Sequence, residues 1–178
     1  MRNIWTIASR ELNSYFVSPV AYVVGAAFLL VSGVLFSLTL TSTMDASLRG
    51  TFSNITFILV LLAPALTMKL LAEEQRMGTL ELLLTSPVHD WQVVVGKFLG
   101  SLILFAVMLL GPTLFYVVLL VWLGTPDFGP IISGYLGVLL LGGAFLSIGV
   151  LTSSLTQNQV IAYILGLAIL LVMWIADS

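Results

Sequence analysis

Charged side chains are scarce in this sequence. They make up 8% of its 178 residues, whereas 60% of the residues are hydrophobic and the mean hydropathy is +1.15. A soluble domain carries about 25% charged residues, so a chain of this composition could not cover its own surface in water. We therefore expect an integral membrane protein. The net charge of −2 excludes the broad basic surface of a nucleic-acid-binding protein, and we expect no nucleic-acid partner.

Metal-binding and redox residues are also missing. The sequence has no cysteine, which excludes disulfides, thiolate zinc sites and iron–sulfur clusters. It has a single histidine, His89, and a zinc site needs more ligands than one histidine and loop carboxylates supply. The N-terminus does not resemble a cleavable signal peptide, because the first apolar run comes too late and is too long. We expect no metal and no cofactor bound to this chain.

Five apolar runs are long enough to cross a membrane. A hydrocarbon core of about 30 Å needs roughly 20 apolar residues in a helix, and a helix, unlike an open strand, satisfies its own backbone in lipid. We therefore expect an all-α integral membrane protein that forms one transmembrane domain over residues 1–178. The expected spans are residues 19–40, 52–71, 93–123, 131–151 and 160–176.

Basic residues set the expected topology. Only Arg49 lies between the first and second spans, whereas the other basic residues precede the first span or lie in or beside the segment 71–97. The positive-inside rule then places the N-terminus and this segment in the cytoplasm. Lys69 and Lys97 fall at cytoplasmic ends of spans, where we expect their side chains to reach up to the headgroups.

Residues 1–17 are expected to form an amphipathic helix. Ile4, Trp5, Ala8 and Tyr15 fall on one helical face, a pattern typical of a helix that lies among the headgroups. An ordinary juxtamembrane helix would show the same pattern. Pro19, after Ser18, predicts the first residue of the next helix.

The spans contain two candidate hinges and no central charge. Pro64 interrupts the second span, and Gly111 and Pro112 interrupt the third, because proline removes a backbone hydrogen bond. Each position is a hinge or a static bend. Ion-coupled carriers usually need an ionisable residue near the middle of the membrane, and none lies there. If the protein moves a substrate, its energy comes from elsewhere.

The segment 71–97 carries about half of the titratable side chains, and catalysis does not explain them. Trp91 and Phe98 stand where a nucleotide-binding phosphate loop ending at Gly96–Lys97 would need glycine and Ser or Thr. The paired Glu73 and Glu74 lack the partner histidines of an intramembrane protease. The titratable residues are Glu73, Glu74, Arg76, Glu81, His89, Asp90 and Lys97.

A docking segment explains these charges better. Residues 72–84 are compatible with a helix apart from Gly78, and Met77, Leu80 and Leu84 form an apolar stripe on it. Asp90 is expected to cap the helix that enters the third span. Such a segment can sit in the groove of a cytoplasmic partner. A solvated connector is the alternative.

These residues resemble the signature of ABC-2 type transporter permeases. The N-terminal run RELNSYFVSPVAYV, residues 10–23, also resembles the gliding-motility-associated subgroup of these permeases. The family has six spans, whereas this chain shows five, so the sixth is missing or not covered. The matching loop residues are Glu74 and Arg76, Gly78–Thr79, Glu81, Leu82–Leu83, Pro87–Val88 and Gly96–Lys97.

The resemblance implies the permease subunit of an ATP-driven exporter in the bacterial cytoplasmic (inner) membrane. The chain itself would not be an enzyme, because ATP and Mg²⁺ would bind a separate ABC ATPase subunit. A second permease protomer, identical or paralogous, and membrane lipid would be its other partners. The interface helix would carry Trp5, Arg10, Glu11 and Tyr15. The ATPase-coupling residues would be Glu73, Glu74, Arg76, Gly78, Thr79, Glu81, Leu83 and Pro87.

Two other functions remain open. One is a non-transporting membrane anchor that recruits a cytoplasmic ATPase or assembly through the same segment. The other is an intramembrane hydrolase that uses Glu73, Glu74 or His89. No residue identifies a transported substrate.

Overall fold

The computed structural model describes residues 2–43, 47–78, 89–124 and 126–177. This part of the chain is helical and contains no strand, and five of its helices are long and apolar enough to cross a membrane. The expected all-α membrane fold is confirmed. The helices are α1 (Arg2–Val17), α2 (Pro19–Thr43), α3 (Arg49–Thr67), α4 (Ala72–Met77), α6 (Asp90–Leu123), α7 (Phe128–Ser154) and α8 (Gln159–Asp177).

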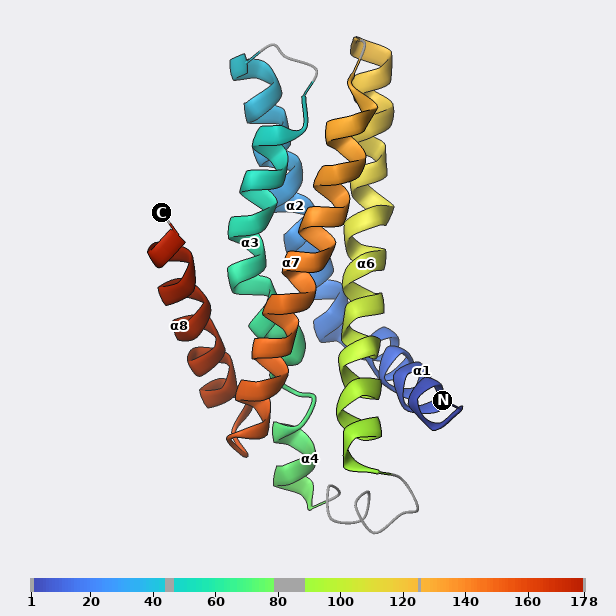
Figure 1. Ribbon diagram of the computed structural model, residues 1–178, viewed down its shortest axis with the longest axis vertical. Helices are drawn as coiled ribbons and strands as arrows, with labels where there is room; N and C mark the ends of the chain where they lie inside the picture. The colour runs from blue at the N-terminus through green and yellow to red at the C-terminus, as the bar shows by residue number, and fades with distance from the viewer. Residues whose placement is uncertain (1, 44–46, 79–88, 125, 178) are drawn as a thin grey trace.

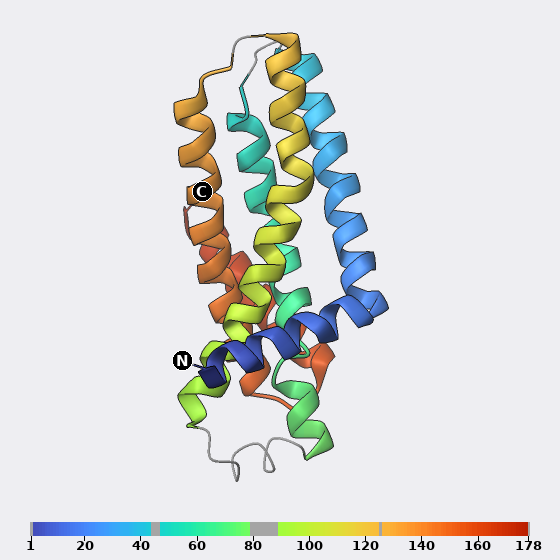
Figure 2. The same ribbon diagram turned by 90° about the vertical axis from the view of Figure 1, so that its right-hand side faces the viewer.

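The long helices form a bundle, and α1 lies across one end of it. In Figure 1, α2, α3, α6 and α7 run along the length of the molecule, and α8 packs beside α3 and α7. Figure 2 shows α1 crossing the bundle near α4 and the start of α6. We call this the α1 end of the bundle. An amphipathic helix in this orientation would lie parallel to a membrane surface.

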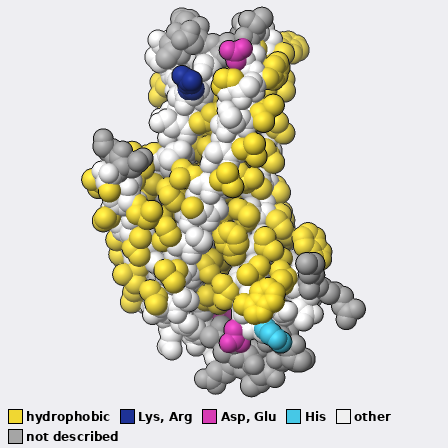
Figure 3. Space-filling view, viewed as in Figure 1, with side chains coloured by type: hydrophobic (Ala, Val, Ile, Leu, Met, Phe, Trp, Pro, Cys, Tyr) yellow, Lys and Arg dark blue, Asp and Glu magenta, His cyan; other side chains and the backbone are white. Residues whose placement is uncertain are grey.

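The core lies around α3. Ile55, Leu59 and Ala63 of this helix are completely or almost completely buried, and they pack with Phe105 of α6 and Leu146 of α7. The outward faces of the other spans are apolar and exposed. On the face seen in Figure 3, the described charged and histidine side chains lie near the two ends, and hydrophobic side chains cover the middle. This distribution suits a helix bundle surrounded by lipid.

Helices α3 and α7 pack closely because a glycine lies between them. A methyl group placed on Gly149 of α7 would clash with the side-chain oxygen of Thr67 on α3. Small residues allow such close packing in membranes, where van der Waals contact between helices replaces the hydrophobic effect. Gly149 therefore brings the end of α7 against the point where α3 stops.

The helix ends follow local sequence signals with two departures. Pro19 is the first residue of α2, as expected, and Gly78 ends α4 with a left-handed φ of 69°. The second span was expected to continue to residue 71, but α3 ends at Thr67 and turns follow it. Asp90 was expected to cap α6. It is instead the first helical residue and follows an extended His89, so its carboxylate favours the helix start through the helix dipole.

The candidate hinges lie inside helices. Pro64 is buried within α3, and α6 continues through Gly111 and Pro112. A hinge at any of these positions stays a prediction.

Candidate functional site

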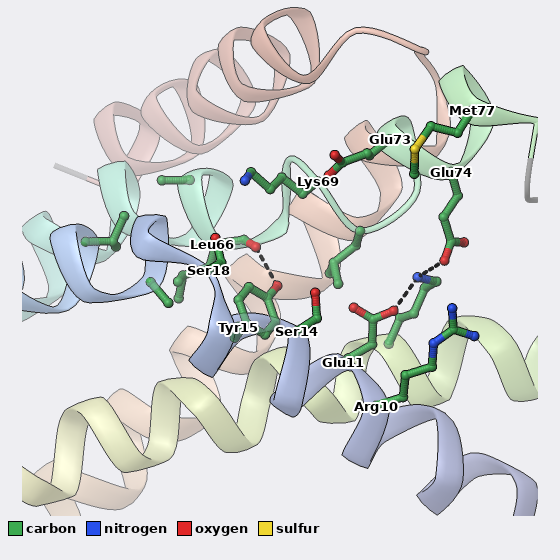
Figure 4. Close-up of a pocket in the computed structure, with 15 residues that line it drawn as sticks. Arg10, Glu11, Ser14, Tyr15, Ser18, Leu66, Lys69, Glu73, Glu74 and Met77 are labelled. Carbon is green, nitrogen blue, oxygen red and sulfur yellow. Dashed lines mark hydrogen bonds and ion pairs between the residues drawn. The ribbon is translucent and has the colours of Figure 1, made fainter.

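A buried lysine joins three helices at the α1 end. The ammonium nitrogen of Lys97, on α6, lies 2.6 Å from a carboxylate oxygen of Glu11 on α1 and 2.8 Å from one of Glu74 on α4. The Lys97 side chain is 2% exposed, and each carboxylate side chain is 18% exposed. Figure 4 shows both ion pairs as dashed lines. We call these three residues the Lys97 network.

The expectation that Lys97 reaches up to the headgroups is wrong. Helix α1 crosses α6 at this point, and a methyl group on Gly100 of α6 would lie 2.8 Å from the Cβ atom of Glu11. The close approach encloses the lysine. A buried ammonium group is costly unless it is paired and hydrogen-bonded, and Glu11 and Glu74 supply both pairs. Glu74 therefore turns into the protein, whereas the sequence pointed it toward an external partner.

Tyr15 fixes α1 to the end of α3. Its hydroxyl donates a 2.6 Å hydrogen bond to the carbonyl oxygen of Leu66. Because α3 stops at Thr67 and the amide of Leu70 donates to Thr67 instead, the Leu66 carbonyl lacks its usual helical donor. Burial raises the pKa of the Tyr15 phenol above its ordinary value of 10, and Glu11 raises it further. Tyr15 thus remains a protonated donor at neutral pH.

Ser153 at the end of α7 fixes the start of α4. Its hydroxyl oxygen accepts hydrogen bonds from the amides of Leu71 and Ala72, both at 3.1 Å, and donates one to the carbonyl of Met68. The first amides of a helix have no partner within it, so this hydroxyl caps α4 from a distant part of the chain. The side-chain amide of Gln75 also donates to the carbonyl of Ser154 at 2.9 Å.

A cavity of about 380 Å³ lies next to the Lys97 network, between α1, α3 and α4. Figure 4 shows Lys69 and Glu73 on one side of it, and Tyr15, Glu11 and Arg10 of α1 on the other. Neither Lys69 nor Arg10 forms an ion pair with a carboxylate of the described residues. Glu73 and Met77 line the same cavity, which therefore combines polar and apolar walls.

The residues predicted for coupling fall into three groups. Glu74 faces inward, and Glu73 lines the cavity. Arg76 is exposed at the end of α4, where Gly78 stops the helix. The remaining predictions, Thr79, Glu81, Leu83 and Pro87, lie outside the described residues.

The residues predicted for the interface helix α1 also differ in their surroundings. Glu11 and Tyr15 bind other helices, whereas Trp5 is 64% exposed and Arg10 is exposed. In the part of the chain that the structure describes, no group of three or more acidic or histidine side chains could hold a metal ion.

Sequence reasoning missed three residues that organise this site. Lys97 was expected at the headgroups and as part of a motif, with no buried partner, and Gln75 and Ser153 were not considered. A lysine one turn inside an apolar helix was a signal for Lys97, because such a charge needs a partner. Nothing local distinguishes Ser153 from the other serines of its helix.

The described residues of the site connect helices to one another. Helix α4 is bonded to α7 through Ser153 and to α1 and α6 through Lys97. A displacement of α4 must therefore break these bonds or move the helices to which it is bonded. The arrangement suits the transfer of motion.

Comparison with known proteins agrees with this arrangement. The family described as ABC-2 family transporter protein matches residues 34–176, and this range contains α3, α4, α6 and α7. No curated protein matches the chain. Members of the family are membrane permeases of ABC transporters, which implies partnership with an ABC ATPase. Since the match covers most of the sequence, this multi-pass membrane protein belongs to the ABC-2 family of transporter permeases.

Proposed function

We propose that this permease is the membrane subunit of an ATP-driven exporter in the bacterial inner membrane, within the gliding-motility-associated subgroup. Its N-terminus and α4 would face the cytoplasm, where a separate ABC ATPase binds ATP and Mg²⁺. The chain would pair with a second permease protomer and would not itself catalyse a reaction. The observation that carries the proposal is the Lys97 network, which connects α4 with a transmembrane helix and with α1.

Helix α4 has two different faces, as a coupling element needs. Its inward side is held by Glu74 and Gln75, whereas Arg76 is exposed and Met77, at the rim of the cavity, is 62% exposed. An exposed cation beside an exposed apolar side chain suits contact with a protein partner. Arg76 and Met77 would bind the ATPase, and Glu74 would pass its motion to Lys97.

The segment after Gly78 would extend the same contact. Thr79, Glu81, Leu83 and Pro87 remain our proposed contacts there, on the basis of the family resemblance of their sequence. Trp5 and Arg10 would hold α1 among the lipid headgroups, because both side chains are exposed.

The test separates binding from coupling. The permease is produced with its ATPase, and the association of the two subunits and the ATPase rate are measured for Arg76→Glu, Met77→Asp and Glu74→Gln. We expect Arg76→Glu and Met77→Asp to lose association with the ATPase, because the side chains of Arg76 and Met77 are exposed. We expect Glu74→Gln to keep association and to lose the stimulation of ATP hydrolysis by the permease.

Arg49→Glu is the matched control, because Arg49 is also an exposed cation but starts α3 at the opposite end of the bundle. It should behave as the unmodified chain does. Unchanged association and ATPase rate in all three α4 variants would refute the proposal. Retained association with no substrate movement in the unmodified complex would instead identify a membrane anchor.

A further inference from the structure

A second cavity, which is apolar, adjoins the 380 Å³ cavity at the α1 end. It has a volume of about 630 Å³ and runs between α2 and α3, with Trp174 of α8 also on its wall. Most of its lining is aliphatic or aromatic, including Val31 of α2 and Leu61 of α3. We call it the α2–α3 groove, and we call the 380 Å³ space at the α1 end the polar cavity.

The groove and the polar cavity meet. Val24 of α2 and Ala65 of α3 line both spaces. Leu61 and Ala65 lie one turn apart on α3, and Lys69 follows four residues later, in the turn after this helix ends at Thr67. Leu61 lines only the groove and Lys69 only the polar cavity. One wall of the joined spaces therefore changes from the apolar side chains of Leu61 and Ala65 to the positive charge of Lys69.

The polar cavity can bind a phosphate group at its Lys69 side. Lys69 forms no ion pair with a described carboxylate, and two of the three carboxylates that line the cavity, those of Glu11 and Glu74, are committed to Lys97, whereas that of Glu73 is not. The hydroxyl-bearing residue Ser14 lines the same space. Ammonium and hydroxyl groups are the donors that phosphate oxygens accept.

The position of the two spaces matches the depth of a lipid. The polar cavity is lined by α1, an amphipathic helix that lies across the bundle end and would sit at headgroup depth. The groove begins from there and continues along the apolar spans. Both volumes lie within the range of small-molecule sites, about 300–1,000 Å³.

We infer that the polar cavity and the α2–α3 groove form one binding site for a membrane phospholipid. Its phosphate lies at Lys69, and one acyl chain follows Ala65 and Leu61 toward Trp174. A soluble phosphate would leave the groove empty. A helix of a second copy could cover the groove, but it would not fill the polar cavity, which α1 and α4 enclose. A phospholipid accounts for both spaces.

The test measures lipid binding to the purified full chain in detergent. Native mass spectrometry follows the binding of dioleoyl phosphatidylglycerol, with dioleoylglycerol as the matched lipid without phosphate. We expect one saturable phosphatidylglycerol per chain and at least tenfold weaker binding of dioleoylglycerol. Lys69→Gln should weaken phosphatidylglycerol binding about tenfold, since a hydrogen bond to a charged group is lost. Arg49→Gln removes a cation at the other end of the bundle and should have no effect.

A second measurement locates the acyl chain. The sequence has four tryptophans, so Trp5, Trp91 and Trp122 are replaced by phenylalanine and Trp174 is retained. Phosphatidylglycerol with brominated acyl chains should quench Trp174 fluorescence, with saturation at one lipid per chain. Ala65→Phe, which narrows the passage between the two spaces, should weaken this quenching.

Three results would overturn the inference. The first is unchanged binding of phosphatidylglycerol by Lys69→Gln. The second is binding of dioleoylglycerol as tight as that of phosphatidylglycerol. The third is a loss of phosphatidylglycerol binding in Arg49→Gln equal to that in Lys69→Gln. A dimer that carries no lipid would show that a second copy occupies the groove, and would also overturn it. No ATPase is present in these measurements, so their failure would leave the proposed coupling function untouched, and the reverse also holds.

Discussion

Replacement of Lys97 by methionine removes the centre of the network and leaves its two carboxylates behind. Glu11 and Glu74 would then face each other across the vacated site without a cation between them. Removal of one partner from a buried ion pair costs about 3–5 kcal/mol. Because each carboxylate side chain is 18% exposed, water screens part of the repulsion between Glu11 and Glu74. We expect Lys97→Met to lower the free energy of unfolding by about 3 kcal/mol.

The assay is denaturant unfolding in detergent, with hydrogen exchange of the α4 amides as a local readout. We expect these amides to exchange faster in Lys97→Met, because α4 loses its bond to α6. The matched rescue combines Lys97→Met with Glu11→Gln and Glu74→Gln. It removes all three charges and should recover most of the stability, since neutral amides need no counter-charge. Arg49→Met, an exposed cation at the other end, should change stability by less than about 0.5 kcal/mol.

Two results would refute this reasoning. If Lys97→Met unfolds within about 0.5 kcal/mol of the unmodified chain, the network does not hold the helices together. If the triple variant is as unstable as Lys97→Met alone, the loss arises from altered packing and not from uncompensated charge.

Three further changes test the contacts around the network. Ser153→Ala removes the acceptor of two α4 amides and should cost about 1–3 kcal/mol of unfolding free energy. Ser147→Ala, whose hydroxyl bonds only within α7, should cost almost nothing, and equal losses would contradict the capping role. Gly149→Ala places a methyl group against the Thr67 hydroxyl oxygen, closer than van der Waals contact allows, and should cost about 1–3 kcal/mol in the same assay. Gly137→Ala, with no atom within 4 Å, is its control, and equal stability of the two would argue against close α3–α7 packing. Tyr15→Phe should cost about 1 kcal/mol at neutral pH. Because the folded-state pKa of Tyr15 is raised, its contribution is complete below the ordinary phenol pKa of 10 and falls as the pH rises above it, so Tyr15→Phe should flatten the stability loss measured above pH 10. An unchanged alkaline slope would contradict burial of this phenol.

The sequence was sufficient for the fold because each span carries its own signal. A helix in lipid satisfies its backbone internally, so length and hydrophobicity alone predict it. The ends were predictable where one residue decides them, as Pro19 starts α2 and Gly78 ends α4. The end of α3 was not, because the residue that permits the early turn is Ser153, which caps α4 from the end of α7.

The candidate site was predictable only in part, because its contacts join residues far apart in the chain. The sequence indicated Glu74 and Glu11 separately, with no sign that both bind Lys97. It treated Lys97 as exposed, because only the crossing of α1 over α6 encloses it. The roles of Thr79, Glu81, Leu83 and Pro87 stay predictions.

The short length of α4 explains why its anchors matter. Helix α4 has six residues, and an isolated helix shorter than about 12 residues is marginal in water. Its shape and position therefore depend on the bonds that Ser153, Gln75 and Lys97 make to it. If a partner pushed on a longer, self-stable helix, that helix could tilt alone. A push on α4 acts directly on α6 through Lys97 and on α7 through Ser153, so the same contacts that make this helix stable also make it able to transmit motion.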